Sequence, residues 1–247
     1  KIAGLLLGAR KAYRTTAVLG LTTDTDDADG QALLQRPIPA LDVAVIEAAL
    51  GPLRGSITQR APIYSALKQG GEPLYAKARR GELIEAPERE VVVHALDLLD
   101  RDGPRLQLHV ECGSGTYVRS LVRDLGEALG CGAHVKVLRR TWVEPFMEPV
   151  MYTLEQLQTL AEQGDAALDA CLLPIEAGLA GFPAIALGPT DAATLGHGQP
   201  VQPAGASEAD TVAVHDASGR VLGLGRIDAD GRLHPRRLFI WATPHAA

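Results

Sequence analysis

Cysteines and aromatic residues are scarce in this sequence, and each shortage narrows the class of protein. The three cysteines, Cys112, Cys131 and Cys171, are odd in number, far apart and never arranged as C-x-x-C. This usage argues against a disulfide framework and against a zinc site, and it is typical of a reducing cytoplasm. Aromatic residues make up only 4% of the chain, so a tyrosine in a basic, polar context stands out.

Long apolar runs are also missing. A membrane-spanning helix needs about 20 apolar residues, and the longest candidate, residues 2–9, is short and interrupted by Gly4 and Gly8. It has neither the basic leader nor the small-residue cleavage site of a signal peptide, so we expect a short buried helix. We therefore expect a cytoplasmic protein without membrane contact. Because the chain opens with Lys1 rather than Met, we expect a further segment upstream.

The signatures of metal and nucleotide sites are absent too. The seven histidines show no H-x-x-x-H or H-E-x-x-H spacing, and there is no P-loop or G-x-G-x-x-G pattern. The acidic residues 24–30 lack the order of a calcium loop, and Arg36 stands where its closing Glu would be. We expect no metal and no cofactor. Residues 113–115, Gly-Ser-Gly before a predicted helix, fit either a backbone cradle for an anion or a plain tight turn.

Positive charge is unevenly distributed along the chain. The net charge of −6 argues mildly against a nucleic-acid binder. However, residues 1–14 hold four basic residues and no acidic one, and residues 54–89 hold seven basic against four acidic. Residues 119–140 hold five basic against two acidic. Such local basic faces are compatible with RNA binding, although solvated surface charge explains them equally well.

Hydrophobic periodicity predicts an α+β fold with a mainly antiparallel central sheet and flanking helices. Alternation predicts strands at residues 13–21, 91–99, 106–112 and 135–143. The clearest helix spans residues 117–129, where five apolar side chains form one stripe: Val118, Leu121, Val122, Leu125 and Leu129. A capping box, Thr153 with Gln156, predicts a later helix.

Composition divides the chain into parts. Residues 60–89 are polar, basic and rich in Gly and Pro, which indicates an insertion rather than core. After a Gly-Phe-Pro segment at residues 181–183, short strands are predicted at residues 211–215, 221–227 and 237–241, a spacing that suits a small β-barrel-like domain. We therefore predict domains at residues 1–181 and 182–247.

Two tyrosines and one arginine are candidate site residues. Tyr13 lies among Arg10, Lys11 and Arg14, and Tyr117 lies two residues before Arg119. An aromatic ring beside cations can stack on a flipped base, but a tyrosine that simply caps the core is the commoner arrangement. Arg119 falls near the core edge of its helix, where an arginine needs a carboxylate partner, and none is local in the sequence.

Several segments resemble the bacterial TruB family of tRNA pseudouridine-55 synthases. Residues 113–126, GSGTYVRSLVRDLG, resemble its G-T-Y-I-R-x-L-x-x-D-L-G motif, and residues 130–140 resemble its G-x-G-A-H-x-x-x-L-R-R motif. Residues 13–30 are similar to its K-x-Y…L-G-x-x-T-x-T-D-x-x-G region. Residues 62–68 and 74–81 resemble an insertion of the stand-alone bacterial enzymes rather than the guide-RNA-dependent ones.

The resemblance implies a function and roles for particular residues. The family isomerises a uridine of the tRNA T-loop without metal, nucleotide or redox cofactor. By resemblance, Tyr13 stacks on the extruded uracil and takes part in proton removal, while Tyr117 and Leu138 line the base pocket. Arg119 is expected to pair with the nucleophilic Asp. The C-terminal domain is expected to be PUA-like, and the insertion is expected to grip RNA through four cations: Lys68, Lys77, Arg79 and Arg80. The expected partner is the tRNA T-stem-loop, with no obligate protein partner.

One part of the family pattern is missing from this sequence. The family's nucleophile lies in a G-H-T-G-x-L-D-P loop, and no Asp of this chain, including those of residues 24–29, matches that motif. We therefore expect the nucleophile upstream of Lys1 and no activity from this chain alone. Without that Asp, Arg119 is expected to be disordered, solvated, or paired with a substitute carboxylate or anion. The alternative is a non-catalytic tRNA-binding or chaperone protein on the same fold, which the upstream sequence would distinguish.

Overall fold

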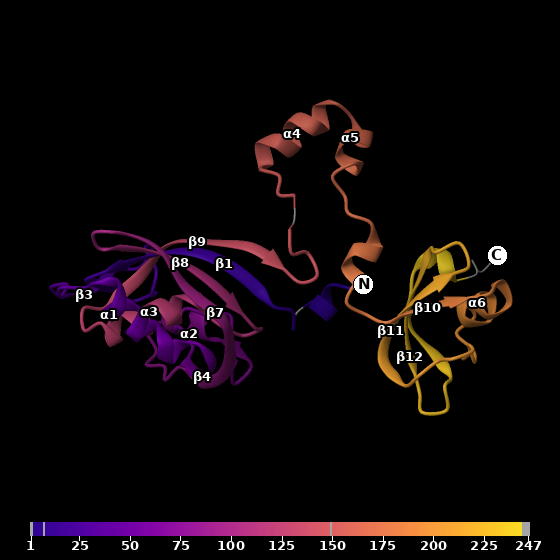
Figure 1. Cartoon of the computed structure of the whole chain (residues 1–247), viewed down its shortest axis with the longest axis horizontal. Helices are drawn as coiled ribbons and strands as arrows, with labels where there is room; N and C mark the ends of the chain where they lie inside the picture. Colours follow the sequence, from indigo (N-terminus) through magenta and orange to yellow (C-terminus); the bar gives the residue numbers. More distant parts are fainter. Residues whose placement is uncertain (1, 7, 149, 244–247) are drawn as a thin grey trace. The chain divides into compact units, whose positions relative to one another are not determined.

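The computed structural model describes residues 2–6, 8–148 and 150–243 (Figure 1). The chain divides into two compact units. One spans Leu5–Pro149, and the other combines Lys1–Gly4 with Val150–Ala247. The functional division into residues 1–181 and 182–247 stays a prediction. In the described part of the chain, no helix is long and apolar enough to cross a membrane.

The first unit is built on a five-stranded antiparallel sheet in the order β4-β7-β8-β1-β9 (Figure 1). Its strands are β1 (Lys11–Leu19), β4 (Gly55–Arg60), β7 (Glu88–Asp102), β8 (Arg105–Cys112) and β9 (Ala133–Val143). The predicted central antiparallel sheet is confirmed, and β1 lies between β8 and β9. This arrangement puts the N-terminal candidate Tyr13 beside residues more than a hundred positions later in the chain.

Two helices, α1 (Val43–Leu50) and α3 (Val118–Ala128), pack on one face of this sheet. The predicted stripe of α3 is buried against sheet residues such as Leu108 and Val110. Gly126 allows α3 to approach the start of β9, because an added Cβ would lie 2.2 Å from the backbone nitrogen of Ala133. A larger residue there would push the helix, and the arginines it carries, away from the sheet.

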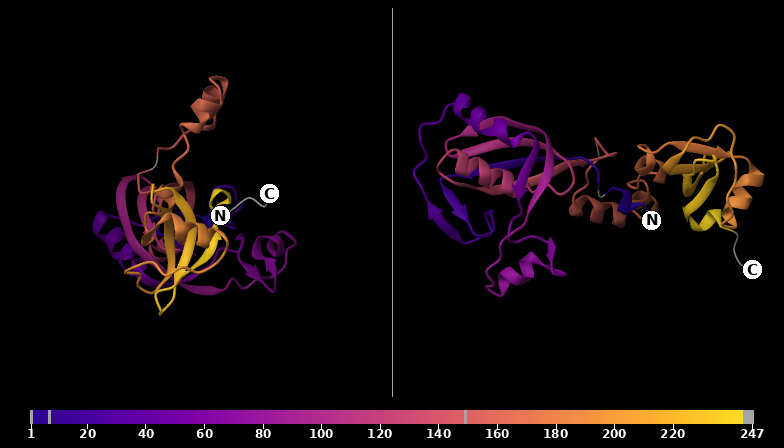
Figure 2. Two further views of the ribbon diagram at one scale, coloured as in Figure 1. Left: turned by 90° about the vertical axis from the view of Figure 1, so that its right-hand side faces the viewer. Right: turned by 90° about the horizontal axis from the view of Figure 1, so that it is seen from below.

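The first unit also contains a two-stranded hairpin, the insertion and a 3₁₀ turn. The hairpin of β2 (Leu21–Thr23) and β3 (Ala32–Gln35) encloses an acidic turn. The insertion holds β5 (Lys68–Gln69), β6 (Glu72–Pro73) and α2 (Leu74–Arg79), and it stands away from the sheet (Figure 2). A 3₁₀ turn, η2 (Gly51–Leu53), follows α1.

The prediction of a short buried helix at residues 2–9 is wrong in part. The segment forms only one 3₁₀ turn, η1 (Ala3–Leu6), and Ala3, Gly4 and Leu5 are exposed. A single turn has few internal hydrogen bonds and no continuous apolar face, so its side chains are not drawn into a core. Leu7 lies outside the described residues.

The second unit ends in a four-stranded sheet in the order β10-β11-β12-β13, with β10 parallel to β11 and the other pairs antiparallel. Its strands are β10 (Ala184–Leu187), β11 (Ala209–Asp216), β12 (Val221–Ile227) and β13 (Leu233–Leu238). With the helices, these sheets confirm the predicted fold class of an α+β chain with a small C-terminal β-domain.

Helices and turns of the second unit were predicted less completely. They are α4 (Leu154–Glu162), α5 (Asp165–Asp169), α6 (Pro189–Gly196), η3 (Ile175–Leu179) and η4 (Ile240–Ala242). The capping box of Thr153 and Gln156 at the start of α4 is confirmed. The strand predicted at residues 237–241 is wrong in its bounds: β13 begins earlier and includes Pro235, which an edge strand tolerates because one side of its backbone needs no sheet partner.

Candidate active site

Tyr13 and Leu138 lie on the same face of the sheet. In the β1–β9 register, Tyr13 is opposite Arg140 and Thr15 is opposite Leu138. Because side chains alternate between the faces of a strand, residues two apart share a face. Tyr13 is also opposite the buried Val110 and packs against the main core, so this is the face that α3 covers. A register shift in β9 between the partners of Ala12 and Tyr13 aligns Arg140 with Tyr13.

The environment of Tyr13 keeps its hydroxyl protonated at neutral pH. Burial raises the pKa of Tyr13, and the negative charge of Cys112 in its thiolate form raises it further, whereas the Arg140 guanidinium lowers it by a smaller amount. A raised pKa means that the phenolate is disfavoured. The ring can stack and the hydroxyl can donate a hydrogen bond, but accepting a proton would require the site to change when substrate binds.

Arg119 joins three segments of the chain. It lies in the first turn of α3, where Nη1 donates to the carbonyl of Thr25 at 2.8 Å and to Oδ2 of Asp27 at 3.0 Å. Nη2 donates to the carbonyl of Tyr64 at 2.9 Å. Of the three outcomes expected for Arg119 without an upstream Asp, the structure shows pairing with a carboxylate. The sequence did not identify that carboxylate, because Asp27 is 92 positions away.

Tyr117 occupies the N-cap position of α3 and is half-buried. Its backbone is held by the fully buried side chain of Gln59, which accepts from the Tyr117 amide at 2.8 Å and donates to its carbonyl at 3.1 Å. Arg89 lies over the Tyr117 ring at 6.0 Å and donates to the Gly115 carbonyl at 3.3 Å. Gln59 and Arg89 position Tyr117, and neither was predicted from the sequence. Gln59 lies in a strand of mixed polarity, where one more amide side chain does not indicate a buried contact.

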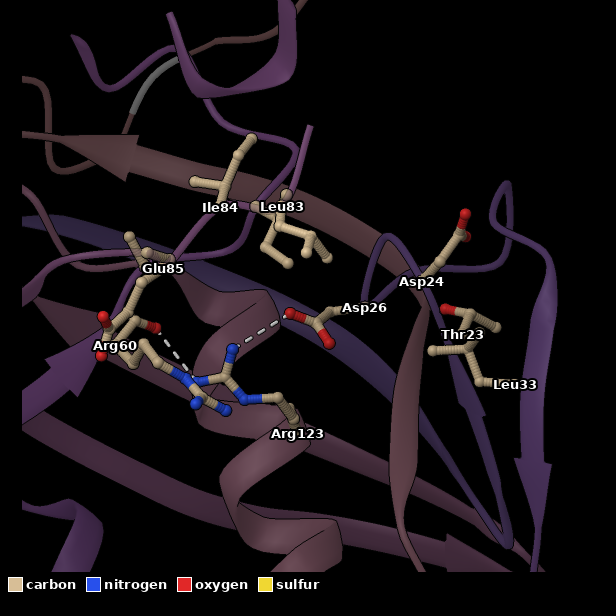
Figure 3. A pocket seen from close by; sticks show the side chains of 12 residues that line it. Thr23, Asp24, Asp26, Leu33, Arg60, Leu83, Ile84, Glu85 and Arg123 are labelled. Carbon is tan, nitrogen blue, oxygen red and sulfur yellow. Dashed lines mark hydrogen bonds and ion pairs between the residues drawn. The ribbon is translucent and has the colours of Figure 1, made fainter. Parts of the chain in front are cut away.

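A cavity of about 550 Å³ lies between the β2–β3 hairpin, both ends of the insertion and α3 (Figure 3). Its polar wall includes Asp24, Asp26, Arg60, Glu85 and Arg123, and apolar side chains complete it. Figure 3 shows the Asp26 carboxylate and the Arg123 guanidinium pointing toward each other. Although three carboxylates line the cavity, among the described residues no group of three or more His, Cys, Asp or Glu could hold a metal ion.

Arg123 repeats the bonding pattern of Arg119 one helical turn later. It donates to Oδ2 of Asp26 at 3.2 Å, to Oδ1 of Asp124 at 2.9 Å and to the carbonyl of Arg60 at 3.0 Å. Burial raises the pKa of Asp26, and the charges of Arg123 and Arg119 offset this only in part. The ionised form of Asp26 is therefore a net cost to the folded state.

The four predicted RNA-binding cations of the insertion differ in their surroundings. Lys68 and Arg79 are exposed, Lys77 is half-buried, and Arg79 lies over the Tyr75 ring at 5.5 Å. Arg80 pairs with two carboxylates, Glu72 at 2.9 Å and Glu82 at 2.6 Å. A phosphate would have to compete with both carboxylates for Arg80, whereas Lys68 and Arg79 face solvent.

The predicted site residues thus fall into groups. Tyr13 and Leu138 are brought together on adjacent strands, and Tyr117 and Arg119 lie at the start of α3, which contacts both β1 and β9. The insertion cations belong to a separate element, and Arg119 is linked to the insertion by its hydrogen bond to the Tyr64 carbonyl. This arrangement brings together an aromatic ring and a fixed cation, with a basic insertion as a separate element.

Comparisons with known proteins agree over nearly the whole chain. Residues 1–118 match the TruB family pseudouridylate synthase N-terminal domain, residues 119–180 the tRNA pseudouridylate synthase B C-terminal domain, and residues 183–239 the pseudouridine synthase II TruB C-terminal region. Over 97% of this chain, it is 62% identical to a tRNA pseudouridine synthase B of Xanthomonas campestris, covering 77% of that protein. It is 46% identical to that of Stutzerimonas stutzeri, covering 78% of it.

Solved structures show the same fold at low identity. A Cbf5-Nop10-Gar1 complex superposes with a TM-score of 0.71 at 22% identity, covering 98% of this chain and 71% of that one. A chain of an H/ACA RNP bound to a substrate RNA superposes with a TM-score of 0.70 at 20% identity. The match covers 97% of this chain and 68% of that one. With the family models spanning the chain and close relatives covering most of their own length, the protein belongs to the TruB family of pseudouridine synthases.

Proposed function

We propose that the intact protein isomerises uridine to pseudouridine in tRNA, at position 55 of the T-loop. The observation that carries this proposal is Arg119, fixed by Asp27 and two backbone carbonyls at the start of α3. Membership of the TruB family and the names of the relatives, tRNA pseudouridine synthase B, support it. We place the family's nucleophilic Asp upstream of this chain, since no Asp here matches its motif.

The reaction conserves every atom of the base. The N1 glycosidic bond breaks, the uracil turns, C5 bonds to C1′ of the ribose, and the proton from C5 leaves while N1 gains one. The target base must leave its stack to reach a catalytic group, so the site needs an aromatic surface and cations for the backbone. Tyr13 supplies the stacking ring, and Tyr117 and Leu138 line the pocket for the base.

Arg119 is suited to hold a second carboxylate. Three of its N–H donors bind Thr25, Asp27 and Tyr64, and the planar guanidinium has further donors for an incoming Asp. An adjacent guanidinium favours the ionised form of a carboxylate, which keeps a nucleophile charged in a site that excludes water. In this proposal Asp27 holds Arg119 ready, and the upstream Asp completes the site.

The flanking parts would bind the rest of the tRNA. We assign residues 1–181 to catalysis, residues 60–89 to the grip on RNA, and residues 182–247 to a PUA-like RNA-binding domain. The family models support this division, since one ends at residue 180 and the next begins at residue 183.

The activity test compares this 247-residue chain with the intact protein. Both are expected to bind tRNA, but only the intact protein should release tritium from a T-stem-loop carrying 5-tritiated uridine. No metal, nucleotide or reductant should be needed. Release by the shorter chain would contradict the placement of the nucleophile. Tight binding by the intact protein without release would favour the non-catalytic tRNA-binding alternative.

Replacing Tyr13 with Phe separates the ring from the hydroxyl in the intact protein. We expect RNA affinity to hold, because the ring still stacks, and turnover to drop by about 10² if the hydroxyl moves a proton. Single-turnover tritium release and equilibrium binding measure the two effects. Equal turnover for Phe and Tyr at position 13 would show that the hydroxyl takes no part in the proton transfer.

The insertion is tested by the salt dependence of tRNA binding. Replacing Lys68, Lys77 and Arg79 with Ala should weaken binding and reduce the slope of log affinity against log salt by about 1 for each phosphate that is no longer neutralised. Arg80→Ala, which removes a cation already held by two carboxylates, should change the slope less. Arg105→Ala, outside the insertion, is the control. An unchanged slope for the triple variant would identify these cations as solvated surface charge.

A further inference from the structure

We propose that Asp26 and Arg123 form a positioning pair that holds Arg119 in its working orientation. The inference rests on the proposed function, because it gives Asp26 and Arg123 a role in the same isomerisation. Neither residue is expected to touch the uridine. Their effect passes through the loop that carries Asp27 and Thr25, two of the three partners of Arg119.

The two arginines bind the same two segments in the same way. Arg119 and Arg123 are four positions apart on α3 and therefore lie on one face of the helix. Arg119 takes the Asp27 carboxylate and the Tyr64 carbonyl, and Arg123 takes the Asp26 carboxylate and the Arg60 carbonyl. Each arginine thus links two segments to α3: residues 24–30, called the acidic loop, and residues 60–64, the start of the insertion. A displacement of one arginine is therefore transmitted to the other.

The backbone conformation of the acidic loop allows both carboxylates to pair with arginines of α3. Asp26 has φ of 61° and, among the described residues, is the only non-glycine residue with a positive φ. In an extended strand the carboxylates of Asp26 and Asp27 would point to opposite sides, but the left-handed residue lets both reach α3. The carbonyl of Asp26 accepts from the Val135 amide at 3.0 Å, and the Ala28 amide donates to the Val135 carbonyl at 2.9 Å, which anchors the loop to β9.

The Asp26–Arg123 pair is more deeply buried than the Asp27–Arg119 pair. The side chains are 16% and 15% exposed, respectively, less than the 28% and 21% of Asp27 and Arg119. Because burial raises the pKa of Asp26 despite its partner, the folded state binds a proton more readily than the unfolded chain does. The stability contributed by this group is thus present at acidic pH and is lost as pH rises through the raised pKa. At neutral pH, the ionised form of Asp26 is therefore held in the folded state at a cost, and its geometry rather than this ionisation is the basis for its proposed role.

Removing the Asp26 charge should loosen Arg119 without unfolding the protein. Arg123 would keep Asp124 and the Arg60 carbonyl, but the loop would lose its only ion pair with Arg123 among the described residues, and a weaker hydrogen bond to a neutral amide would replace it. The loop would then be held less firmly against α3 even with the left-handed backbone of residue 26 preserved, and Asp27 would shift relative to Arg119. A displaced Arg119 would hold the nucleophile out of line, which slows the chemical step rather than the binding of RNA.

The experiment compares Asp26→Asn with Asp29→Asn in the intact protein, by tritium release from a T-stem-loop. Asn tolerates a positive φ, so Asp26→Asn removes the charge while preserving the backbone. Asp29 is exposed in the same turn and serves as the matched control for loss of one negative charge. We expect kcat to fall about 10- to 100-fold for Asp26→Asn with KM nearly unchanged, and Asp29→Asn to match wild type.

Three further variants distinguish a positioning role from a structural one. Arg123→Gln and the double variant Asp26→Asn/Arg123→Gln should lose about as much turnover as Asp26→Asn alone, since the two residues act as one unit. Asp26→Gly, which keeps the left-handed backbone, should behave like Asp26→Asn. Thermal melting at pH 7 should show Asp26→Asn at least as stable as wild type.

The possible results separate this inference from the proposed function. Wild-type turnover by Asp26→Asn, or a loss explained by a lower melting temperature and weaker RNA binding, would overturn the positioning role while leaving the proposed function intact. Additive losses in the double variant would do the same. An intact wild-type protein that binds tRNA but releases no tritium would overturn the proposed function, and this inference with it.

Discussion

The guanidinium of Arg119 binds segments that are far apart in the sequence: the acidic loop through Thr25 and Asp27, and the start of the insertion through Tyr64. An arginine in this half-buried position costs free energy unless its donors are satisfied. The loop and the insertion must therefore fold against α3, since they supply those acceptors. The orientation of the candidate catalytic cation and the placement of the insertion consequently depend on the same set of contacts.

The sheet supplies the second constraint. Antiparallel pairing brings Tyr13 opposite Arg140 and places Leu138 on the same face. Gly126 allows α3 to lie close to the start of β9, so the helix that carries Arg119 and Arg123 is fixed relative to the strand that carries Leu138 and Arg140. A small residue at one close contact and a register shift in one strand thus set the geometry of the site.

Much of the fold was predictable because it depends on local pattern. Alternation and the stripe of α3 are repeated signals, and the central sheet and helix follow from them. The elements β10 and α6 were missed because AIAL is too short to alternate clearly and PTDAATLG carries a weak apolar face. The last strand was predicted too late in the chain, because the apolar residues 238–241 fit a strand pattern and Pro235 disfavours a strand at its true position.

The residues of the candidate site come from family motifs and stay a prediction, whereas their partners were not predicted from the sequence. Tyr13, Tyr117, Leu138 and Arg119 follow from family motifs, whereas the pairing of Arg119 with Asp27 depends on tertiary structure across 92 positions. The same holds for Gln59, whose amide holds the Tyr117 backbone from within the core. No periodicity or propensity records which buried polar groups meet, because such contacts are set by the packing of whole elements.

The role of Arg119 is tested most directly by Arg119→Lys in the intact protein, with tritium release and tRNA affinity measured on the same T-stem-loop. Lysine keeps the positive charge but loses the planar fork that binds the loop and a second carboxylate together. The account predicts a fall in turnover of about 10² or more with affinity changed by less than about threefold. Normal turnover with weakened binding would contradict it and would identify Arg119 as a phosphate-binding residue.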